Sequence, residues 1–110
     1  MIFHVVSVDE WTAEVERPYA PASLAVEGFV HCSADRHAAL AIADGPLRDV
    51  PELLVLQIDE SALGAEVCWE GSTDMLFPHV YGPIERDAVG AVLAVRRDAD
   101  GRARELTPWI

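Results

Sequence analysis

The stretch "LLVLQID" (residues 53–59) decides the fold class. Five of its first six residues are apolar, and no glycine or proline interrupts them, which is typical of a buried strand. Because both of its faces are apolar, it is expected to lie in the centre of a sheet. Further strand-like segments surround it in the sequence, at residues 2–8, 29–32, 65–70, 77–84 and 102–106. Residues 88–97 fit a strand slightly better than a helix, and "DADG" (residues 98–101) predicts a hairpin turn after them.

Helical patterns are short and lie in the first half of the chain, at residues 10–16, 24–27 and 34–44. Asp9, Ser23 and Ser33 precede these segments and are expected to be their N-caps. Gly28 should end the second helix in a left-handed conformation. Strands outnumber helices, so we predict an α+β fold: a compact, mostly antiparallel sheet, split in two, with two or three helices packed on it.

The composition is that of a soluble globular protein. Hydrophobic residues make up 51% and charged residues 25% of the chain, and its 110 residues suit a single domain over residues 1–110. No apolar run is long enough to span a bilayer, and the opening "MIFHVVSVDEW" lacks the basic region of a signal peptide. We therefore expect a cytoplasmic protein without membrane contact, whose cysteines Cys32 and Cys68 stay reduced.

The charge is strongly and unevenly acidic. The formal net charge is −11, lysine is absent, and residues 1–85 hold three arginines against fifteen carboxylates. Because nucleic-acid binding needs basic side chains to neutralise phosphates, this balance argues against a nucleic-acid partner. The simplest role of the charge is solubility. Nothing in the sequence indicates an obligate protein partner.

Three of the four histidines, His4, His31 and His79, stand in apolar strand-like segments. Since a buried imidazole without a partner is costly, they are either separately satisfied core residues or parts of one polar site. Strand alternation places His31 and Ser33 on one face and Cys32 on the other, which argues against a Cys–His nucleophile. No C-x-x-C or H-x-x-x-H spacing is present, so we expect no metal site.

The segment "FPHVYGPI" (residues 77–84) concentrates His79, Tyr81, two prolines and a glycine in an apolar run. Two interpretations stay open, an edge-strand loop and the shaped wall of a pocket. Trp11, Tyr19 and Trp69 could also line a pocket, although we expect them to fill the core.

Several of these segments form an ordered set. "IFHVVS", "SLAVEGFVHCS", "LLVLQID" and "FPHVYGPI" together resemble the bacterial domain-of-unknown-function family 952 over nearly the whole chain. That family is similar in turn to the ADP-ribosyltransferase fold, and within it to the RNA 2′-phosphotransferases. The resemblance implies an ADP-ribosyltransferase-like split sheet.

The resemblance also implies a site. His4 matches a first-strand histidine that holds a ribose of NAD, and His31 matches a second-strand histidine near the nicotinamide end. Ser33 matches the serine two residues further on. The third motif position falls in or near "FPHVYGPI", where His79 and Tyr81 are the candidates. On this basis His4 and His31 are the expected catalytic residues, and all five residues are expected to bind the cofactor.

The implied function is that of a transferase that uses NAD or ADP-ribose, with a small-molecule nucleotide as its ligand. Two departures weaken this assignment. The sequence has no counterpart of the phosphotransferases' nucleic-acid-binding lobe and arginines, and no glutamate lies inside "FPHVYGP", where Glu70 or Glu85 would be a forced match. A non-catalytic module that binds a nucleotide or metabolite is therefore the alternative, and RNA 2′-phosphate transfer is disfavoured.

Overall fold

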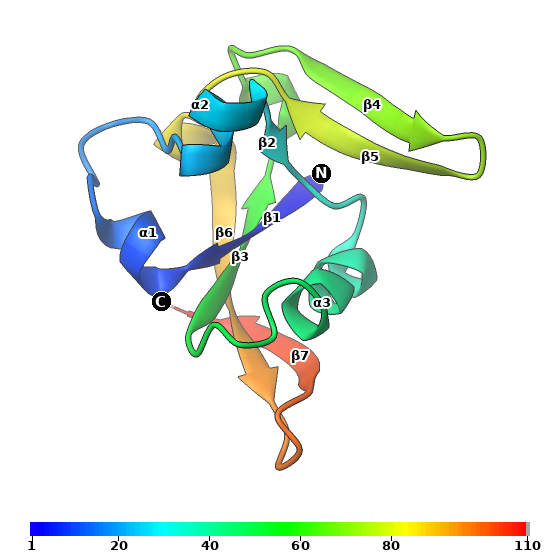
Figure 1. Ribbon diagram of the computed structural model, residues 1–110. Coiled ribbons are helices and arrows are strands. Elements are labelled where there is room, and N and C mark those ends of the chain that lie inside the picture. Colours follow the sequence, from blue (N-terminus) through cyan, green and yellow to red (C-terminus); the bar gives the residue numbers. More distant parts are fainter. Residues whose placement is uncertain (110) are drawn as a thin grey trace.

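The strands form two antiparallel sheets in the computed structural model, which describes residues 1–109 (Figure 1). They are β1 (Ile2–Ser7), β2 (Val30–His31), β3 (Leu53–Ile58), β4 (Val67–Ser72), β5 (Met75–Val80), β6 (Val89–Arg97) and β7 (Ala103–Pro108). The larger sheet has the order β1-β3-β6-β7, and the smaller sheet has the order β2-β5-β4. The predicted α+β class with a split, mostly antiparallel sheet is confirmed. The last residue of the domain predicted over residues 1–110 lies outside the described part.

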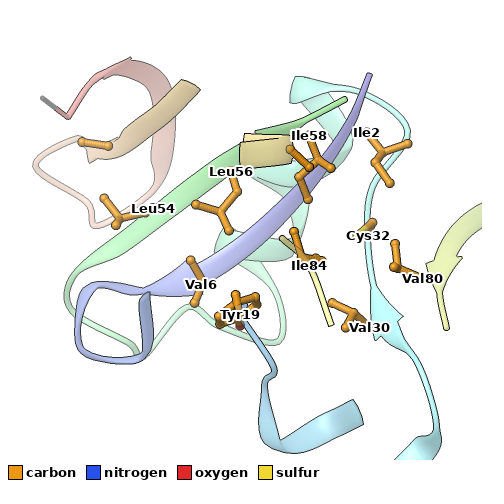
Figure 2. Packing of buried hydrophobic residues seen from close by; sticks show 12 residues of the cluster. Ile2, Val6, Tyr19, Val30, Cys32, Leu54, Leu56, Ile58, Val80 and Ile84 are labelled. Carbon is orange, nitrogen blue, oxygen red and sulfur yellow. The ribbon is translucent and has the colours of Figure 1, made fainter. Parts of the chain in front are cut away.

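The central strand is β3, as the apolar residues on both of its faces predicted. It pairs with β1 on one side and β6 on the other, so that Val55 stands between Val5 and Leu93. Its alternate side chains enter two cores. Leu54 and Leu56 belong to the core between the two sheets, shown in Figure 2, whereas Val55 packs with residues of α3 (Arg36–Asp44).

The segment 88–97, which fitted a strand better than a helix, is strand β6 beside β3. The turn after it reverses the chain into β7, as "DADG" predicted. Gly101 adopts φ 82° there, and its N–H donates to the carbonyl of Asp98 at 2.9 Å. A left-handed φ favours glycine, so the glycine at position 101 itself favours this turn.

The helices are α1 (Val8–Thr12), α2 (Ala22–Glu27) and α3, with short 3-10 turns η1 (Glu60–Ala62) and η2 (Arg86–Ala88). Gly28 ends α2 at φ 86°, as predicted. The first two predicted caps are wrong, because Ser7 caps α1 and Pro21 precedes α2. Both helices begin earlier than predicted, and α1 is only five residues long. No helix within residues 1–109 is long and apolar enough to cross a membrane.

The predicted cap of α3 is also wrong, and the reason lies in the tertiary structure. The side chain of Asp35 caps this helix, accepting from the N–H of Ala38 at 2.8 Å. Ser33 is instead bound to β1, since its N–H donates to the carbonyl of Phe3 and its carbonyl accepts from the N–H of Phe3. The helix can therefore begin only after the chain has left this bridge.

The Phe3–Ser33 bridge is where the two sheets meet. β1 is an edge strand of the larger sheet, and β2 is an edge strand of the smaller sheet. Beyond the bridge the two strands have different partners, because β1 pairs with β3 and β2 pairs with β5. The open edge of β1 past this bridge borders the candidate site.

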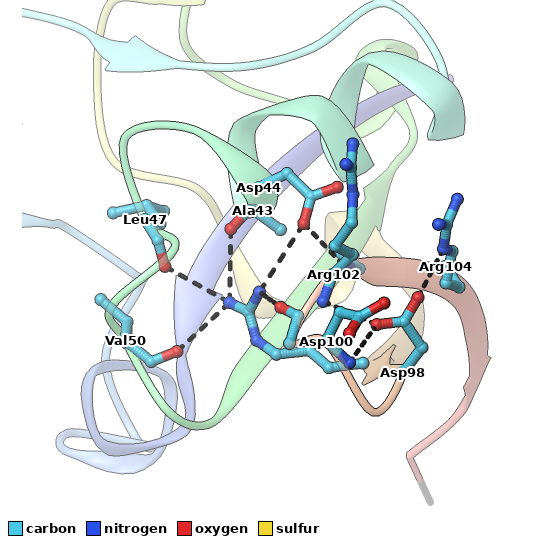
Figure 3. Close-up of polar contacts among 11 residues, drawn as sticks. Ala43, Asp44, Leu47, Val50, Asp98, Asp100, Arg102 and Arg104 are labelled. Carbon is cyan, nitrogen blue, oxygen red and sulfur yellow. Dashed lines mark hydrogen bonds and ion pairs between the residues drawn. The ribbon is translucent and has the colours of Figure 1, made fainter.

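The segment after α3 is held in place by an arginine of β6. The Arg97 guanidinium donates to the carbonyl oxygens of Ala43, Leu47 and Val50, at 3.3 to 3.4 Å. Figure 3 draws the bonds to Ala43, Leu47 and Val50 as dashed lines, and the carboxylate of Asp44 lies 3.8 Å from the guanidinium. Arg97 therefore satisfies backbone acceptors that a loop would otherwise have to expose to water.

Candidate functional site

A pocket of about 800 Å³ opens where the two sheets part. Its walls come from β1, from the start of α2, from the segment 31–33, from Phe77 and His79 of β5, and from the segment 42–53. Four of the five predicted site residues line it: His4, His31, Ser33 and His79. The fifth, Tyr81, is not in the lining. The pocket is mostly apolar with a few polar groups, which is typical of small-molecule sites.

His4 is buried and lines this pocket, with both ring nitrogens bonded to the protein. Nδ1 lies 2.6 Å from the carbonyl oxygen of His31, and Nε2 lies 3.0 Å from the hydroxyl of Tyr19. A carbonyl can only accept, so Nδ1 carries the proton and Nε2 accepts from Tyr19. Burial lowers the pKa of His4 to about 4, which keeps the ring neutral at pH 7. His4 therefore ties β1, β2 and the Tyr19 segment together around the pocket.

His31 and His79 face one another across the smaller sheet. They are register partners in β2 and β5, and their ring centroids are 5.3 Å apart. Phe29 packs against both rings, stacked on His79 at 4.2 Å and tilted on His31 at 4.8 Å. Alternation therefore brings three rings to one face of the smaller sheet, at the side of the pocket.

Each of these two histidines pairs with a glutamate. Nε2 of His31 lies 2.5 Å from a carboxylate oxygen of Glu27, and Nδ1 of His79 lies 2.9 Å from Glu70. Hydrogen bonds from Tyr81 and from His79 lower the pKa of Glu70, so this carboxylate is ionised and accepts. His79 therefore donates through Nδ1, and in the neutral ring Nε2 is left as a proton acceptor.

Tyr81 supports the same carboxylate from outside the pocket. Its hydroxyl donates to Glu70 at 2.5 Å, and this bond raises the pKa of Tyr81 to about 12. The hydroxyl stays protonated at any physiological pH, so it acts as a hydrogen-bond donor that orients Glu70 and, through it, His79. Tyr81 therefore acts on the pocket only through Glu70 and His79, and does not line it.

Ser33 carries a hydroxyl that the protein does not use. The residue is 4% exposed and lines the pocket. Its backbone pairs with Phe3, but within residues 1–109 its side chain has no hydrogen-bond partner, and no side-chain N or O atom is both fully enclosed and unpaired. The Oγ atom is therefore open to the pocket, where it can donate to or accept from a ligand.

Cys32 points away from the histidines into the core, as alternation predicted. It is 5% exposed, and burial raises the pKa of its thiol to about 12. Such a thiol stays protonated and is a weak nucleophile. No group of three or more metal-ligating side chains is assembled in the part of the chain that the structure covers.

The central position of β5 was missed. Pro78 predicted an edge strand or loop for residues 77–84, but β5 is the middle strand of the smaller sheet. The carbonyl of Pro78 accepts from the N–H of Cys32 at 3.0 Å, so the proline nitrogen faces the same side. The missing N–H removes the return hydrogen bond of this pair, and β2 accordingly ends one residue earlier, at His31. The pocket-wall interpretation is confirmed for Phe77 and His79.

Other residues of the site gave little signal in the sequence. Tyr19 was expected to fill the core rather than to line a pocket; it is buried in the core, and it also lines the pocket. Glu70 was set aside as a forced match, but the hairpin of β4 and β5 brings it against His79. The spacing of Glu27 and His31 was the one available hint, since the two lie four residues apart. Trp69, expected in the core, is 43% exposed.

Solved structures of a bacterial protein share this architecture. Crystal structures of protein CC0527 from Caulobacter crescentus and of its double mutant both give a TM-score of 0.80, with 29% and 28% sequence identity. In each, 94% of this chain and 92% of that chain are covered. The solution NMR structure of CC0527 gives a TM-score of 0.75 at 30% identity and covers 94% and 90%.

None of the curated proteins matches this chain. A family model matches residues 5–92, which include the whole of β3 and four of the five predicted site residues, all but His4. This chain therefore belongs to the DUF952 family, which is described as "Protein of unknown function (DUF952)".

Proposed function

We propose that the protein binds NAD or a related ADP-ribosyl compound in the pocket between the two sheets and transfers its ADP-ribosyl group. One observation carries the proposal. His4 of β1, His31 and Ser33 of the segment 31–33, and His79 of β5 come from three separate segments and line a single pocket. These are the residues on which the resemblance to the ADP-ribosyltransferase fold rests, and the split sheet agrees with that resemblance.

The chemistry would use the groups of the pocket as follows. The apolar wall and the rings hold the nicotinamide nucleoside, and Ser33 bonds a hydroxyl of the sugar. The bond between C1′ and the nicotinamide nitrogen breaks, its electron pair leaves with nicotinamide, and the acceptor attacks C1′. Nε2 of His79 takes the acceptor's proton, while Glu70 stabilises the imidazolium that forms. His31 orients the sugar at the mouth of the pocket.

The test combines binding with turnover. We expect NAD to raise the melting temperature and to be cleaved with release of nicotinamide. His79→Gln keeps a hydrogen bond to Glu70 but removes the base, so it should lower the release rate about 100-fold and leave binding within a factor of two. His37→Gln, on the exposed side of α3, is the matched control and should behave as wild type. Absence of NAD binding would exclude the proposal.

A non-catalytic binding module is the second candidate, and two observations favour it. Both ring nitrogens of His4 are engaged by the protein, so they are not free to hold a ribose. The pocket lining also contains no arginine or lysine among the residues described. This candidate predicts stabilisation by a nucleoside or nucleotide together with no release of nicotinamide, and with no difference between His79→Gln and wild type in any turnover assay.

A further inference from the structure

The pocket is surrounded by negative charge. Glu10 is in its lining, and its carboxylate has no partner within residues 1–109. Glu27 and Glu70 are hydrogen-bonded to the imidazoles of His31 and His79, respectively. Three carboxylates therefore lie in or directly behind the walls of the pocket, all of them reachable by solvent, where they attract cations and repel anions.

Two arginines close to this region are used elsewhere, and a third, Arg48, follows the lining residue Leu47 but is exposed and not in the lining. Arg86 donates to the carbonyl oxygens of Trp11, Glu14 and Arg17 and packs over the Trp11 ring at 4.2 Å. Arg97 donates to carbonyl groups behind the segment 42–53. Phosphate groups are normally held by arginine or lysine, and the described lining offers neither. A phosphorylated ligand would thus meet carboxylates with no arginine or lysine in the described lining to bind its phosphate.

Two further features of the lining indicate what the pocket can hold. Tyr19 and Phe77 supply aromatic rings, and Phe77 is 37% exposed, so its ring is accessible from the pocket mouth. Aromatic faces attract organic cations. The unpartnered hydroxyl of Ser33, on a residue that is 4% exposed, supplies a hydrogen bond for a neutral polar group such as a sugar hydroxyl.

We infer that the pocket selects a phosphate-free nucleoside with a positively charged flat ring, an N-glycosylated pyridinium, over nucleotides that carry phosphate. This inference rests on the proposed function, because it concerns the same pocket: it ranks the free nucleoside above NAD, which the pocket still binds but more weakly. The pyridinium charge is attracted by Glu10, Glu27 and Glu70, its ring stacks on Phe77, and its ribose reaches Ser33. Phosphate on the 5′ oxygen loses affinity through repulsion by the same carboxylates.

Calorimetric titration of four ligands at low salt distinguishes the effect of ligand charge on affinity from the effect of ligand shape. Nicotinamide riboside carries the cation, its reduced form has nearly the same shape without the charge, nicotinamide mononucleotide adds one phosphate, and NAD adds the dinucleotide. We expect nicotinamide riboside to bind most tightly. The reduced form and the mononucleotide should each bind about tenfold more weakly, the size expected of one lost or one repelled charge near a protein surface.

Two glutamate variants locate the effect in the pocket. Glu10→Gln removes the lining carboxylate and should weaken nicotinamide riboside about fivefold without changing the affinity for its reduced form. Glu14→Gln removes the same charge four residues away, outside the lining, and should leave both affinities unchanged. Both positions are exposed, so neither substitution disturbs the core.

The outcomes distinguish this inference from the proposal beneath it. If NAD or the mononucleotide binds more tightly than nicotinamide riboside, the charge selection is wrong and the proposed function stands. If the oxidised and reduced ribosides bind equally, or Glu10→Gln has no effect, the selection by positive charge is likewise wrong. If none of the four ligands binds, both proposals fail.

Discussion

The larger and the smaller sheet use strand alternation differently. In the larger sheet, the central strand β3 is covered on both faces, and Leu54, Val55 and Leu56 are at most 1% exposed. In the smaller sheet, Val30 and Val80 are fully buried on one face, while the opposite face carries His31 and His79 beside the pocket. A strand with two apolar faces therefore stabilises the fold, whereas a strand with one polar face can carry the side chains of a functional site.

The contrast is energetic as well. Removing a fully buried aliphatic side chain loses both its transfer free energy and the contacts around the cavity it leaves. Residues on the pocket side of the smaller sheet are partly hydrated already, so their loss costs less stability. We therefore expect stability to follow the larger sheet and ligand binding to follow the smaller one.

The largest effect should come from a substitution in β3. Leu56→Ala opens a cavity at a fully buried position of the core between the sheets, and should lower the free energy of unfolding by about 3 kcal/mol. Phe77→Ala, on a residue that is 37% exposed, should cost about 1 kcal/mol or less but weaken ligand binding. Urea denaturation followed by tryptophan fluorescence gives both values. Equal losses in the two variants would contradict the division between the sheets.

The next effect concerns His4, which joins the two sheets, and it depends on pH. Its pKa is lowered by burial to about 4, below the value of 6.5 in the unfolded chain. Between these values the unfolded state binds a proton that the folded state does not, so stability falls as the pH is lowered from 6.5 to 4. This single group should account for about 3 kcal/mol of that loss.

Comparison with His4→Gln isolates this contribution. The variant lacks the titrating ring, so its unfolding free energy should be lower at pH 7 and flatter between pH 6.5 and 4. Carboxylates with lowered pKa values, such as Asp98 and Glu70, also lose stabilising interactions as the pH falls, but they do so in both proteins. His37→Gln serves as the histidine control. A variant as steep as wild type would show that His4 is already protonated in the folded state.

The smallest expected effect distinguishes Asp35 from Ser33, because Asp35 has the capping role that the sequence predicted for Ser33. Asp35→Ala removes the cap of α3 and should cost about 1 kcal/mol of stability with no loss of binding. Ser33→Ala removes a hydroxyl without a protein partner, so it should change stability by less than about 0.5 kcal/mol and weaken nucleoside binding. Thermal unfolding with and without ligand measures both. If Ser33→Ala is the less stable of the two, the hydroxyl has a structural role.

Local patterns predicted much of the fold and part of the site. The mostly apolar run of β3, the left-handed Gly28 and the alternation that separates Cys32 from His31 each depend on a few neighbouring residues, and each is confirmed. The predicted cap at Ser33 is wrong because a serine before a helix has the same local signal whether it caps the helix or pairs with another strand. The bridge to Phe3 decides between these roles, and it joins residues thirty positions apart.

Glutamates and tyrosines of the site were harder to find, because their partners are distant in the sequence. Glu70 contacts His79 only because β4 and β5 form a hairpin, and Tyr19 reaches His4 from a segment without helix or strand. The sequence by itself determined which segments are strands and which face of each is apolar, since both follow from neighbouring side chains. Only the tertiary structure decided that the sheets part beyond Phe3 and Ser33, because long-range pairing of backbone groups sets where one sheet ends and a pocket begins.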